Sequence, residues 1–183
     1  MSLRNLLSRT IEIKNEPREP LFVPPQPPQS QPQRRFGKLT QKQTNRLIAA
    51  VIAEAGAEAP ESRQAVLNSI ENRTKVNPRY YGANLWDVVS KPYQYTGFSV
   101  KDPNYTEVKN YLDGTSKKLT PGRKEQIEQV QNLVNLAQQG KLEDITGGAT
   151  HYLNPKKATD FSWVPKAQKK ATIGEHDFYY LKR

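Results

Sequence analysis

The chain has 183 residues, a formal net charge of +10 and no cysteine. This length is sufficient for one folded domain with a substantial core and an additional segment. The lack of cysteine excludes disulfides, thiolate metal sites and cysteine nucleophiles, and no run of 18 apolar residues suggests a transmembrane helix.

The positive charge lies mainly at the two ends of the chain. Residues 1–38 and residues 151–183 each carry a net charge of +4, whereas residues 39–150 carry +2. A basic protein attracts polyanions such as nucleic acid, anionic lipid or anionic cell-wall polymer. Neither a recognition-helix arrangement nor an aromatic RNA-binding motif accompanies these charges, so we expect no specific nucleic-acid partner.

Residues 1–38 differ in composition from the rest of the chain. Seven of the fourteen prolines lie between Pro17 and Pro32, and such a segment favours an extended polyproline II path. We therefore predict a basic, Pro-rich arm or linker at residues 1–38, suited to docking on a partner, and a folded domain at residues 39–183.

Capping residues predict a series of helices in the folded domain. Thr40 is a good N-cap for a helix from residue 41 to about residue 57, and Pro60 suits the first turn of a second helix that ends near Arg73. Three further helices are predicted: one after Asn84 through Ser90, one from Asp102-Pro103 to Gly114, and one from Thr120-Pro121 to Gly140, with Ile127, Val130, Leu133, Val134, Leu136 and Ala137 facing inward.

The end of the chain has a different pattern. Helical periodicity fades from Gly147 onward, and residues 173–181 are predicted as a strand. The sequence therefore predicts an α+β domain that is predominantly α, preceded by an extended Pro-rich arm.

Glu54 interrupts the apolar face of the first predicted helix. Leu47, Ile48, Val51 and Ile52 recur at helical spacing, and Glu54 lies at the edge of the face that they form. Glu58 follows one turn later. Loss of hydration and repulsion between two neighbouring carboxylates both favour the protonated form that a general acid requires. The alternative is a structural role, in which Glu54 lies at the rim of the core and forms an ion pair with an arginine.

Five motifs in order carry a family resemblance. They are Ala53-Glu-Ala-x-x-Glu58, Gln64-Ala-Val-x-Asn-x-x-x-Asn-Arg73, Tyr93-Gln-Tyr95, Gly147-Gly-Ala-Thr-His-Tyr-x-Asn-Pro155 and Ile173-Gly-x-His-x-Phe-Tyr179. Their order and spacing resemble the SleB-type cell-wall hydrolases, the family of spore-cortex lytic enzymes and related phage lysins. The resemblance covers about residues 43–180 and excludes the arm.

This resemblance implies a lysozyme-like fold and cleavage of the glycan strand of peptidoglycan without a cofactor, often as a lytic transglycosylase. Glu54 matches the catalytic glutamate of the family, which would protonate the glycosidic oxygen and then deprotonate the muramoyl C6 hydroxyl. Glu58 matches the second glutamate, which would orient substrate or bind a neighbouring backbone group. The family usually has Arg-Gly between these glutamates, whereas this chain has Gly56-Ala57, which puts the packing of that loop in doubt.

Further residues are predicted to bind substrate. Gln94, Tyr95 and Thr96 align with the cleft-lining segment of the family, and the alternative is a surface loop packed on the domain. His151, Tyr152 and Asn154 follow two glycines, and glycines allow a ligand to approach the backbone closely. Trp163 is either a sugar-stacking platform or a core aromatic, and His176, Phe178 and Tyr179 are expected to pack the last strand.

Other catalytic classes lack support. The chain has two histidines and no HExxH motif, so we expect no catalytic zinc or other metal. A nucleophile elbow and a phosphate-binding loop are also absent.

The expected setting is a bacteriophage virion acting on the cell envelope. This expectation rests on the lack of a secretory signal in the first residues, on the lack of cysteine and on an arm suited to docking on virion or tail proteins. Action from the host cytoplasm before lysis is the alternative location. Two other functions stay open: a muramidase or glucosaminidase that uses water, and a structural virion adaptor or plug derived from such an enzyme.

Overall fold

We describe the protein from a computed structural model that covers residues 38–92, 94–95 and 101–181. The predictions for residues 1–37 and for Thr96 therefore lie outside the described residues. The helices are α1 (Gln41–Ala55), α2 (Pro60–Val76), α3 (Pro78–Tyr81), α4 (Leu85–Ser90), α5 (Pro103–Leu112) and α6 (Arg123–Gln138). The strands are β1 (His151–Leu153), β2 (Gln168–Ile173) and β3 (His176–Tyr180), and a short 3-10 helix spans Val164–Lys166.

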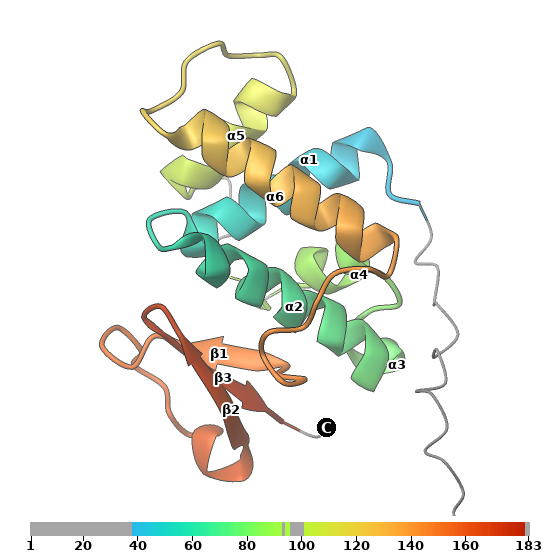
Figure 1. Cartoon of the computed structure of the whole chain (residues 1–183), viewed down its shortest axis with the longest axis vertical. Helices are drawn as coiled ribbons and strands as arrows, with labels where there is room; N and C mark the ends of the chain where they lie inside the picture. Colours follow the sequence, from blue (N-terminus) through green and yellow to red (C-terminus); the bar gives the residue numbers. More distant parts are fainter. Residues whose placement is uncertain (1–37, 93, 96–100, 182–183) are drawn as a thin grey trace, which may run out of the picture. The chain divides into compact units, whose positions relative to one another are not determined.

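Helix α1 is the centre of the helical part. The predicted N-cap is confirmed, because the Thr40 hydroxyl accepts a hydrogen bond from the backbone N–H of Gln43, and the Gln43 side chain accepts one in return from the N–H of Thr40. The helix contacts α2, α4, α5 and α6 (Figure 1), so most of its surface is covered. Leu47 and Val51 are completely buried as a result.

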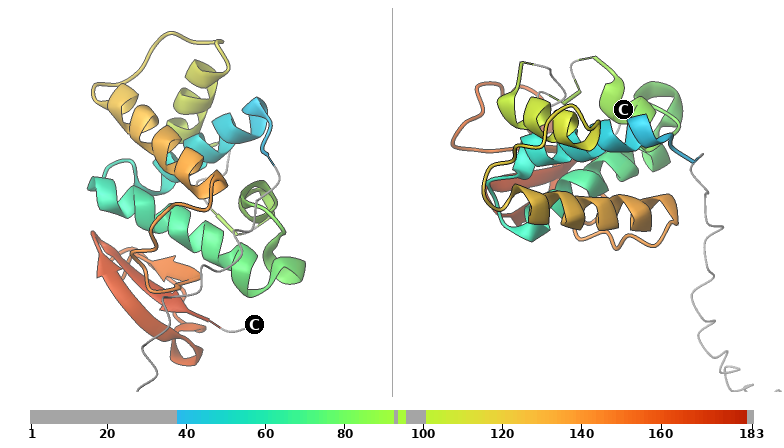
Figure 2. Two further views of the ribbon diagram at one scale, coloured as in Figure 1. Left: turned by 45° about the vertical axis from the view of Figure 1, so that its right-hand side comes forward. Right: turned by 90° about the horizontal axis from the view of Figure 1, so that it is seen from above.

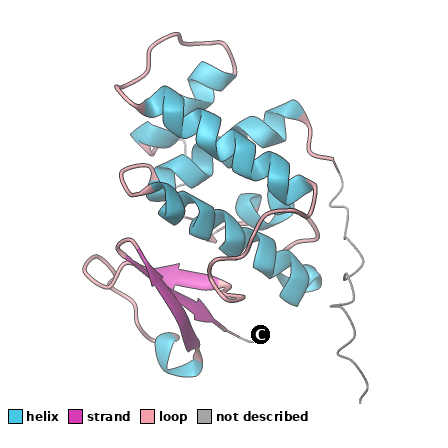
Figure 3. Ribbon diagram, viewed as in Figure 1, coloured by secondary structure: helices cyan, strands magenta, loops and turns pink. Residues whose placement is uncertain are grey.

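Helix α2 lies between the helical part and the sheet, as Figures 2 and 3 show from different directions. It packs on α1, α4 and α6 on one side and on β1 and β2 on the other. The helix extends to Val76, three residues beyond the predicted end, and the N–H of Asn77 still binds the carbonyl oxygen of Arg73. The Asn77 side chain then caps α3 by accepting a hydrogen bond from the N–H of Tyr80. Many of its polar residues are buried, including Asn68, Asn72 and Arg73.

The remaining helices agree with the predictions in most respects. Asn84 and Asp102 are the N-caps of α4 and α5 as predicted. Helix α6 begins at Arg123 rather than near Thr120, since Gly122 has a positive φ of 75° and ends the preceding turn. The prediction that Leu136 faces inward is wrong: its side chain is 39% exposed, whereas the other predicted positions of α6 are buried or half-buried.

The sheet is antiparallel with the strand order β1-β3-β2. The predicted strand at residues 173–181 corresponds to β3, but its predicted first residue is wrong. Ile173 is the last residue of β2, and the chain turns at Gly174 before β3 begins at His176. Gly174 has a φ of +59°, a conformation that favours glycine. His176, Phe178 and Tyr179 are buried in β3, which confirms their predicted packing role.

A small second core fixes the sheet to α2. It consists of Ala65 from α2, Ala149 and Phe178, all completely buried, with Tyr152 packed against them. The confirmed architecture is thus a predominantly helical α+β domain whose small sheet covers one side of α2. Among the described residues, no helix is long and apolar enough to cross a membrane.

Candidate active site

Glu54 lies in the last turn of α1, beside residues of the main core. Its side chain is half-buried, whereas the neighbouring Ile52 and Ala55 are almost completely buried. One carboxylate oxygen, Oε2, accepts a hydrogen bond of 2.8 Å from the hydroxyl of Tyr152. The predicted acid is therefore held by a side chain 98 positions later in the sequence.

Tyr152 is held in β1 by aromatic contacts. Its ring centroid lies 5.5 Å from that of Phe178 and 5.2 Å from that of His176, to which it is perpendicular. Burial raises the pKa of the Tyr152 hydroxyl well above its usual value, and the negative charge of Glu54 raises it further. The hydroxyl thus stays protonated at neutral pH and donates a hydrogen bond to the Glu54 carboxylate.

The turn after α1 is fixed by side chains that bind its carbonyl groups. Arg63 donates from Nη1 to the carbonyl oxygens of Gly56 at 3.2 Å and Glu58 at 2.7 Å, and more weakly to that of Ala55 at 3.5 Å. Gln126 donates to the same Gly56 oxygen at 2.8 Å. Because the last carbonyls of a helix have no partner within the helix, these bonds replace a missing cap.

Gly56 fits this turn because there is no space for a side chain. A Cβ atom at this position would meet the carbonyl oxygen of Ile52 and would lie 2.7 Å from Nη1 of Arg123. The departure from the usual Arg-Gly pair is therefore accommodated by α6, whose Arg123 occupies the adjacent space.

Glu58 joins the turn after α1 to the β2–β3 hairpin. Its Oε2 accepts a hydrogen bond of 3.2 Å from the backbone N–H of Glu175. Its Oε1 lies 3.0 Å from Nδ1 of His176, although the two atoms are not aligned as in a hydrogen bond. Of the two predicted roles, the structure shows the contact with a neighbouring backbone group.

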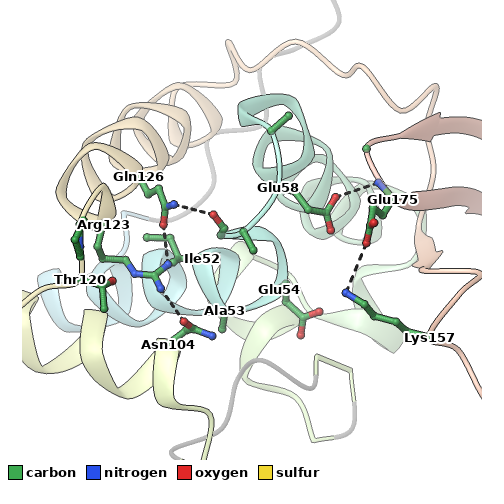
Figure 4. A pocket seen from close by; sticks show the side chains of 15 residues that line it. Ile52, Ala53, Glu54, Glu58, Asn104, Thr120, Arg123, Gln126, Lys157 and Glu175 are labelled. Carbon is green, nitrogen blue, oxygen red and sulfur yellow. Dashed lines mark hydrogen bonds and ion pairs between the residues drawn. The ribbon is translucent and has the colours of Figure 1, made fainter.

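A cavity of about 530 Å³ opens in front of Glu54 (Figure 4). We call it the Glu54 cavity. Its charged lining residues are Glu54, Glu58, Glu175, Arg123 and Lys157. Glu175 and Lys157 face each other across one side of the cavity, with 3.6 Å between Oε2 and Nζ. The cavity is polar and wide enough for a sugar ring and its hydroxyl groups.

A second cavity of about 450 Å³ has Tyr152 among its lining residues. We call it the Arg73 cavity. It brings together four of the predicted substrate-binding residues, namely Gln94, His151, Tyr152 and Trp163. The rings of His151 and Trp163 lie 5.4 Å apart, so they form one aromatic wall. Tyr152 lines this cavity and also binds Glu54, which lines the first one, so this hydrogen bond links the linings of the two cavities.

Arg73 is the buried cation of the second cavity. Its Nε donates to the carbonyl oxygen of Thr150 at 2.6 Å, and its Nη1 donates to Oε1 of Gln94 at 2.7 Å. The guanidinium carbon lies 4.8 Å from the ring centroid of Tyr95 and 5.4 Å from that of Tyr81. These contacts fix Arg73 between two rings beside the acid.

Two predicted site residues lie apart from both cavities. Tyr95 is 7% exposed and its ring packs against the guanidinium of Arg73, so Tyr95 helps to hold Arg73 in place. Asn154 is 8% exposed and donates to Oε2 of Glu175 at 3.0 Å. Their predicted contact with substrate stays a prediction, as does the contact predicted for Thr96.

The sequence reasoning assigned no role to Arg63, Arg73 or Gln126. Arg73 stood at the end of a quoted motif, and that motif was the available signal. Arg63 lies in α2 and binds carbonyl groups of the turn that precedes this helix, whereas Gln126 lies in α6 and binds the same turn from 70 residues away. No local sequence pattern indicates such contacts. Among the described residues, no group of three or more histidine, aspartate or glutamate side chains is arranged to hold a metal ion.

Asp144 organises the glycine turn that leads into β1. Its carboxylate accepts hydrogen bonds from the N–H and hydroxyl of Thr146, from the N–H of Gly148 and from the amide of Asn72. Partial burial opposes ionisation of Asp144, but these hydrogen bonds outweigh it and lower the pKa of its carboxyl. The ionised form thus stabilises the turn that carries His151 and Tyr152.

Asp144→Asn is expected to lower the free energy of unfolding by about 1 kcal/mol at pH 7, since one oxygen acceptor and the charge are lost. A carboxyl whose pKa is lower in the folded protein than in the unfolded chain stabilises the fold at pH values above the unfolded pKa of about 3.9. This stabilisation is lost as the pH falls through the pKa of the folded state. Urea titrations between pH 3 and pH 7 should therefore show the two proteins converging below about pH 4. A constant difference at all pH values would contradict this role of the charge.

Comparison with known proteins agrees with this fold. Residues 57–179 match the Cell Wall Hydrolase family, a range that begins three residues after Glu54. The catalytic domain of the Bacillus cereus SleB protein is similar with a TM-score of 0.52 and 24% identity, over 78% of this chain and 93% of that chain. A comparison with curated proteins gave no significant match.

The catalytic domain of the germination-specific lytic transglycosylase SleB from Bacillus anthracis is similar with a TM-score of 0.53 and 22% identity, over 78% of this chain and 98% of that chain. These likenesses show a shared fold and confirm the predicted lysozyme-like domain. The family match covers more than half of the chain. The chain therefore belongs to the Cell Wall Hydrolase family, and it is a peptidoglycan-cleaving enzyme.

Proposed function

We propose that this enzyme cleaves the glycan strand of peptidoglycan as a lytic transglycosylase, with Glu54 as its single catalytic acid and base. The observation that carries the proposal is the placement of the Glu54 carboxylate in a sugar-sized cavity, with the neutral Tyr152 hydroxyl as a hydrogen-bond donor. A strand that occupies both cavities would pass this carboxylate.

In the proposed reaction, protonated Glu54 donates its proton to the glycosidic oxygen that links muramic acid to the next sugar. The bond from C1 to that oxygen breaks, and the leaving sugar departs with a hydroxyl group. The C6 hydroxyl of the muramoyl residue then attacks C1 and gives its proton to the Glu54 carboxylate. A 1,6-anhydro ring forms, the acid is regenerated and no water is consumed.

Tyr152 supports the second half of this cycle. A neutral phenol hydroxyl donates a hydrogen bond most strongly to the ionised carboxylate, which is the form of Glu54 after it has protonated the leaving oxygen. This bond stabilises the charge while the C6 hydroxyl moves into place. Tyr152 is therefore a positioning residue for Glu54 and, through its ring, a wall of the second cavity.

The contacts of the other carboxylates favour the transglycosylase over a muramidase or glucosaminidase that uses water. Such a hydrolase needs a second carboxylate that is available as base or nucleophile. Glu58 is occupied by the backbone of Glu175 and by His176. Glu175 is held by Asn154 and by lysines, and its pKa is lowered by the Asn154 hydrogen bond and the lysine charges.

Mass spectrometry of muropeptides released from purified sacculi tests the proposal. We expect 1,6-anhydro muramoyl ends, whose mass is lower by one water than that of reducing ends. Digests that contain only reducing muramic acid or reducing glucosamine would identify a muramidase or a glucosaminidase instead. A complete lack of release by the folded protein would favour the structural adaptor or plug.

Tyr152→Phe is expected to lower the cleavage rate about tenfold, since one hydrogen bond to a charged group is lost. The melting temperature should change little, because the ring and its packing on Phe178 stay in place. Initial rates on sacculi and a thermal melt measure the two effects. A large loss of stability with an unchanged specific activity would show that the hydroxyl serves the core rather than the acid.

We propose a phage virion as the setting of this enzyme, with residues 1–38 as the docking arm. The proposal is supported by the composition of the arm, since proline tracts lose little entropy on ordering and suit an extended contact with virion or tail proteins. Removal of residues 1–38 should spare muropeptide release and abolish co-purification with assembled particles. Normal co-purification together with lost wall binding would mean that the arm holds anionic wall polymer instead.

A further inference from the structure

Within the part of the chain that the structure describes, the positive charge of Arg73 has no carboxylate partner. The side chain is only 6% exposed, yet among the described residues Arg73 forms no ion pair. Removing a charge from water is costly unless it is compensated. The two tyrosine rings and the two hydrogen-bond acceptors compensate this charge only in part, because none of them is an anion.

The guanidinium of Arg73, which lines the cavity, keeps donor capacity. Nε and Nη1 make hydrogen bonds, whereas Nη2 makes none to a residue that the structure describes. A guanidinium presents five N–H groups in a planar fork that matches a carboxylate. Because Gln94 and Thr150 already fix the orientation of this fork, an incoming anion would meet donors that need no further ordering.

A second cation stands at the rim of the same cavity. Lys91 is exposed, donates to the carbonyl oxygen of Tyr80 and lies 4.9 Å from the ring centroid of that residue. No aspartate or glutamate is found among the described residues that line this cavity. The Glu54 cavity, by contrast, is lined by three carboxylates, so the two cavities differ in charge.

We propose that the Arg73 cavity binds a carboxylate that the muramic residue carries on its 3-O-lactyl substituent, with Arg73 and Lys91 as its partners. This inference rests on the proposed function, because it concerns the same glycan strand. The muramic residue is the sugar of that strand that bears an acid, either the lactyl group itself or, when a stem peptide is attached, the peptide carboxylates. Both sources present the same chemistry to the two cations.

The position of the cavity explains why the anion would belong to the substrate. Tyr152 binds Glu54 with its hydroxyl and lines the Arg73 cavity with its ring, so one residue separates the acid from the cationic site. In the proposed complex, a group bound there belongs to a sugar near the bond that is cut. The wall of His151 and Trp163 offers aromatic faces for the apolar side of that sugar.

Binding measurements on Glu54→Gln, which should cleave the probes far more slowly than wild type, test the inference by isothermal titration calorimetry. The first pair of probes is a tetrasaccharide with stem peptides and the same compound with every carboxylate converted to an amide. The second pair is the stem-free tetrasaccharide, which exposes the lactyl acid, and a chito-oligosaccharide of equal length, which lacks it. The two pairs separate the two sources of the carboxylate.

We expect the acidic member of at least one pair to bind about tenfold more tightly, as for one charge-assisted hydrogen bond. Lys91→Gln should reduce that ratio, and Arg73→Gln should abolish it. Arg73→Lys should retain part of the preference because the charge remains. The control Lys141→Gln removes one exposed positive charge away from the site and should leave the ratio unchanged.

Equal binding within both pairs would overturn the inference, and so would no detectable binding of any probe to the folded protein. A preference that survives both Lys91→Gln and Arg73→Gln would place the anion elsewhere and would overturn the inference. If Arg73→Gln fails to fold, the inference is tested by the binding ratio within each probe pair and by the effect of Lys91→Gln on that ratio. Sacculus digests with only reducing ends would reject the transglycosylase while leaving the carboxylate preference standing.

Discussion

Replacing Glu54 with glutamine is expected to lower the rate of glycan cleavage by a factor of about 10² to 10⁴, the usual contribution of general acid–base catalysis. Glutamine has nearly the same shape as glutamate, but it cannot donate a proton and take it back. Its amide oxygen still accepts the hydrogen bond from Tyr152, so the fold should survive. Initial rates of muropeptide release measure the effect.

The matched control for this substitution is Glu128→Gln on the exposed side of α6. It removes the same charge without touching either cavity and should keep the wild-type rate. Circular dichroism and a thermal melt of both variants establish that each is folded. If Glu54→Gln released muropeptides as fast as wild type, the assignment of the acid would be wrong.

The second large effect is expected for Arg63→Met, which should lower the free energy of unfolding by about 2 to 4 kcal/mol. Arg63 binds carbonyl groups of the turn after α1 and also donates from Nε to Gln129 at 2.7 Å. Burial lowers the pKa of its guanidinium, although nearby carboxylates such as Glu125 oppose this effect, and arginine remains charged. Methionine fills similar space but leaves the carbonyls without a donor.

Urea titrations of Arg63→Met and of the exposed control Arg79→Met measure this effect. Activity should fall as well, because the turn that loses its donors begins at Gly56, two residues after Glu54. Arg63→Lys should restore only part of the stability, since one ammonium cannot reproduce the fork that binds the carbonyls and Gln129 together. A midpoint of unfolding equal to that of wild type would mean that water replaces the guanidinium without cost.

The helices were predictable from sequence because their ends depend on local chemistry. Thr40, Asn84 and Asp102 each bind the backbone N–H three residues later, a contact that the sequence alone specifies. The start of α6 was misplaced because Thr120 is bound by a distant carboxylate, that of Glu107, and does not cap the helix. Long-range partners of this kind leave no periodic signal.

The sheet was harder to predict for a related physical reason. Strand β2 is an edge strand with three lysine or glutamine residues exposed at its start, so it lacks the alternation that identifies a half-buried strand. Strand β1 has only three residues. Its identity depends on pairing with β3, which lies far away in the sequence.

In the candidate site, sequence reasoning identified single residues better than their partners. Glu54 stood out because a carboxylate interrupted an apolar helix face. Arg73 did not, because an arginine near the end of a polar helix is typical of a solvated surface. Its burial arises from two tyrosine rings supplied by other segments, Tyr81 and Tyr95, and only the folded chain shows that packing.

The bonds of Glu54 and Glu58 also set the order in which the enzyme becomes active. Glu54 binds a residue 98 positions later, and Glu58 binds the hairpin 117 positions later. Closing loops of this length has an entropic cost, and contacts between such distant residues form slowly compared with helices. A chain still being synthesised therefore carries its acid in a formed α1 but without the Tyr152 donor or the hairpin. We expect cleavage to begin only after β3 has joined the sheet.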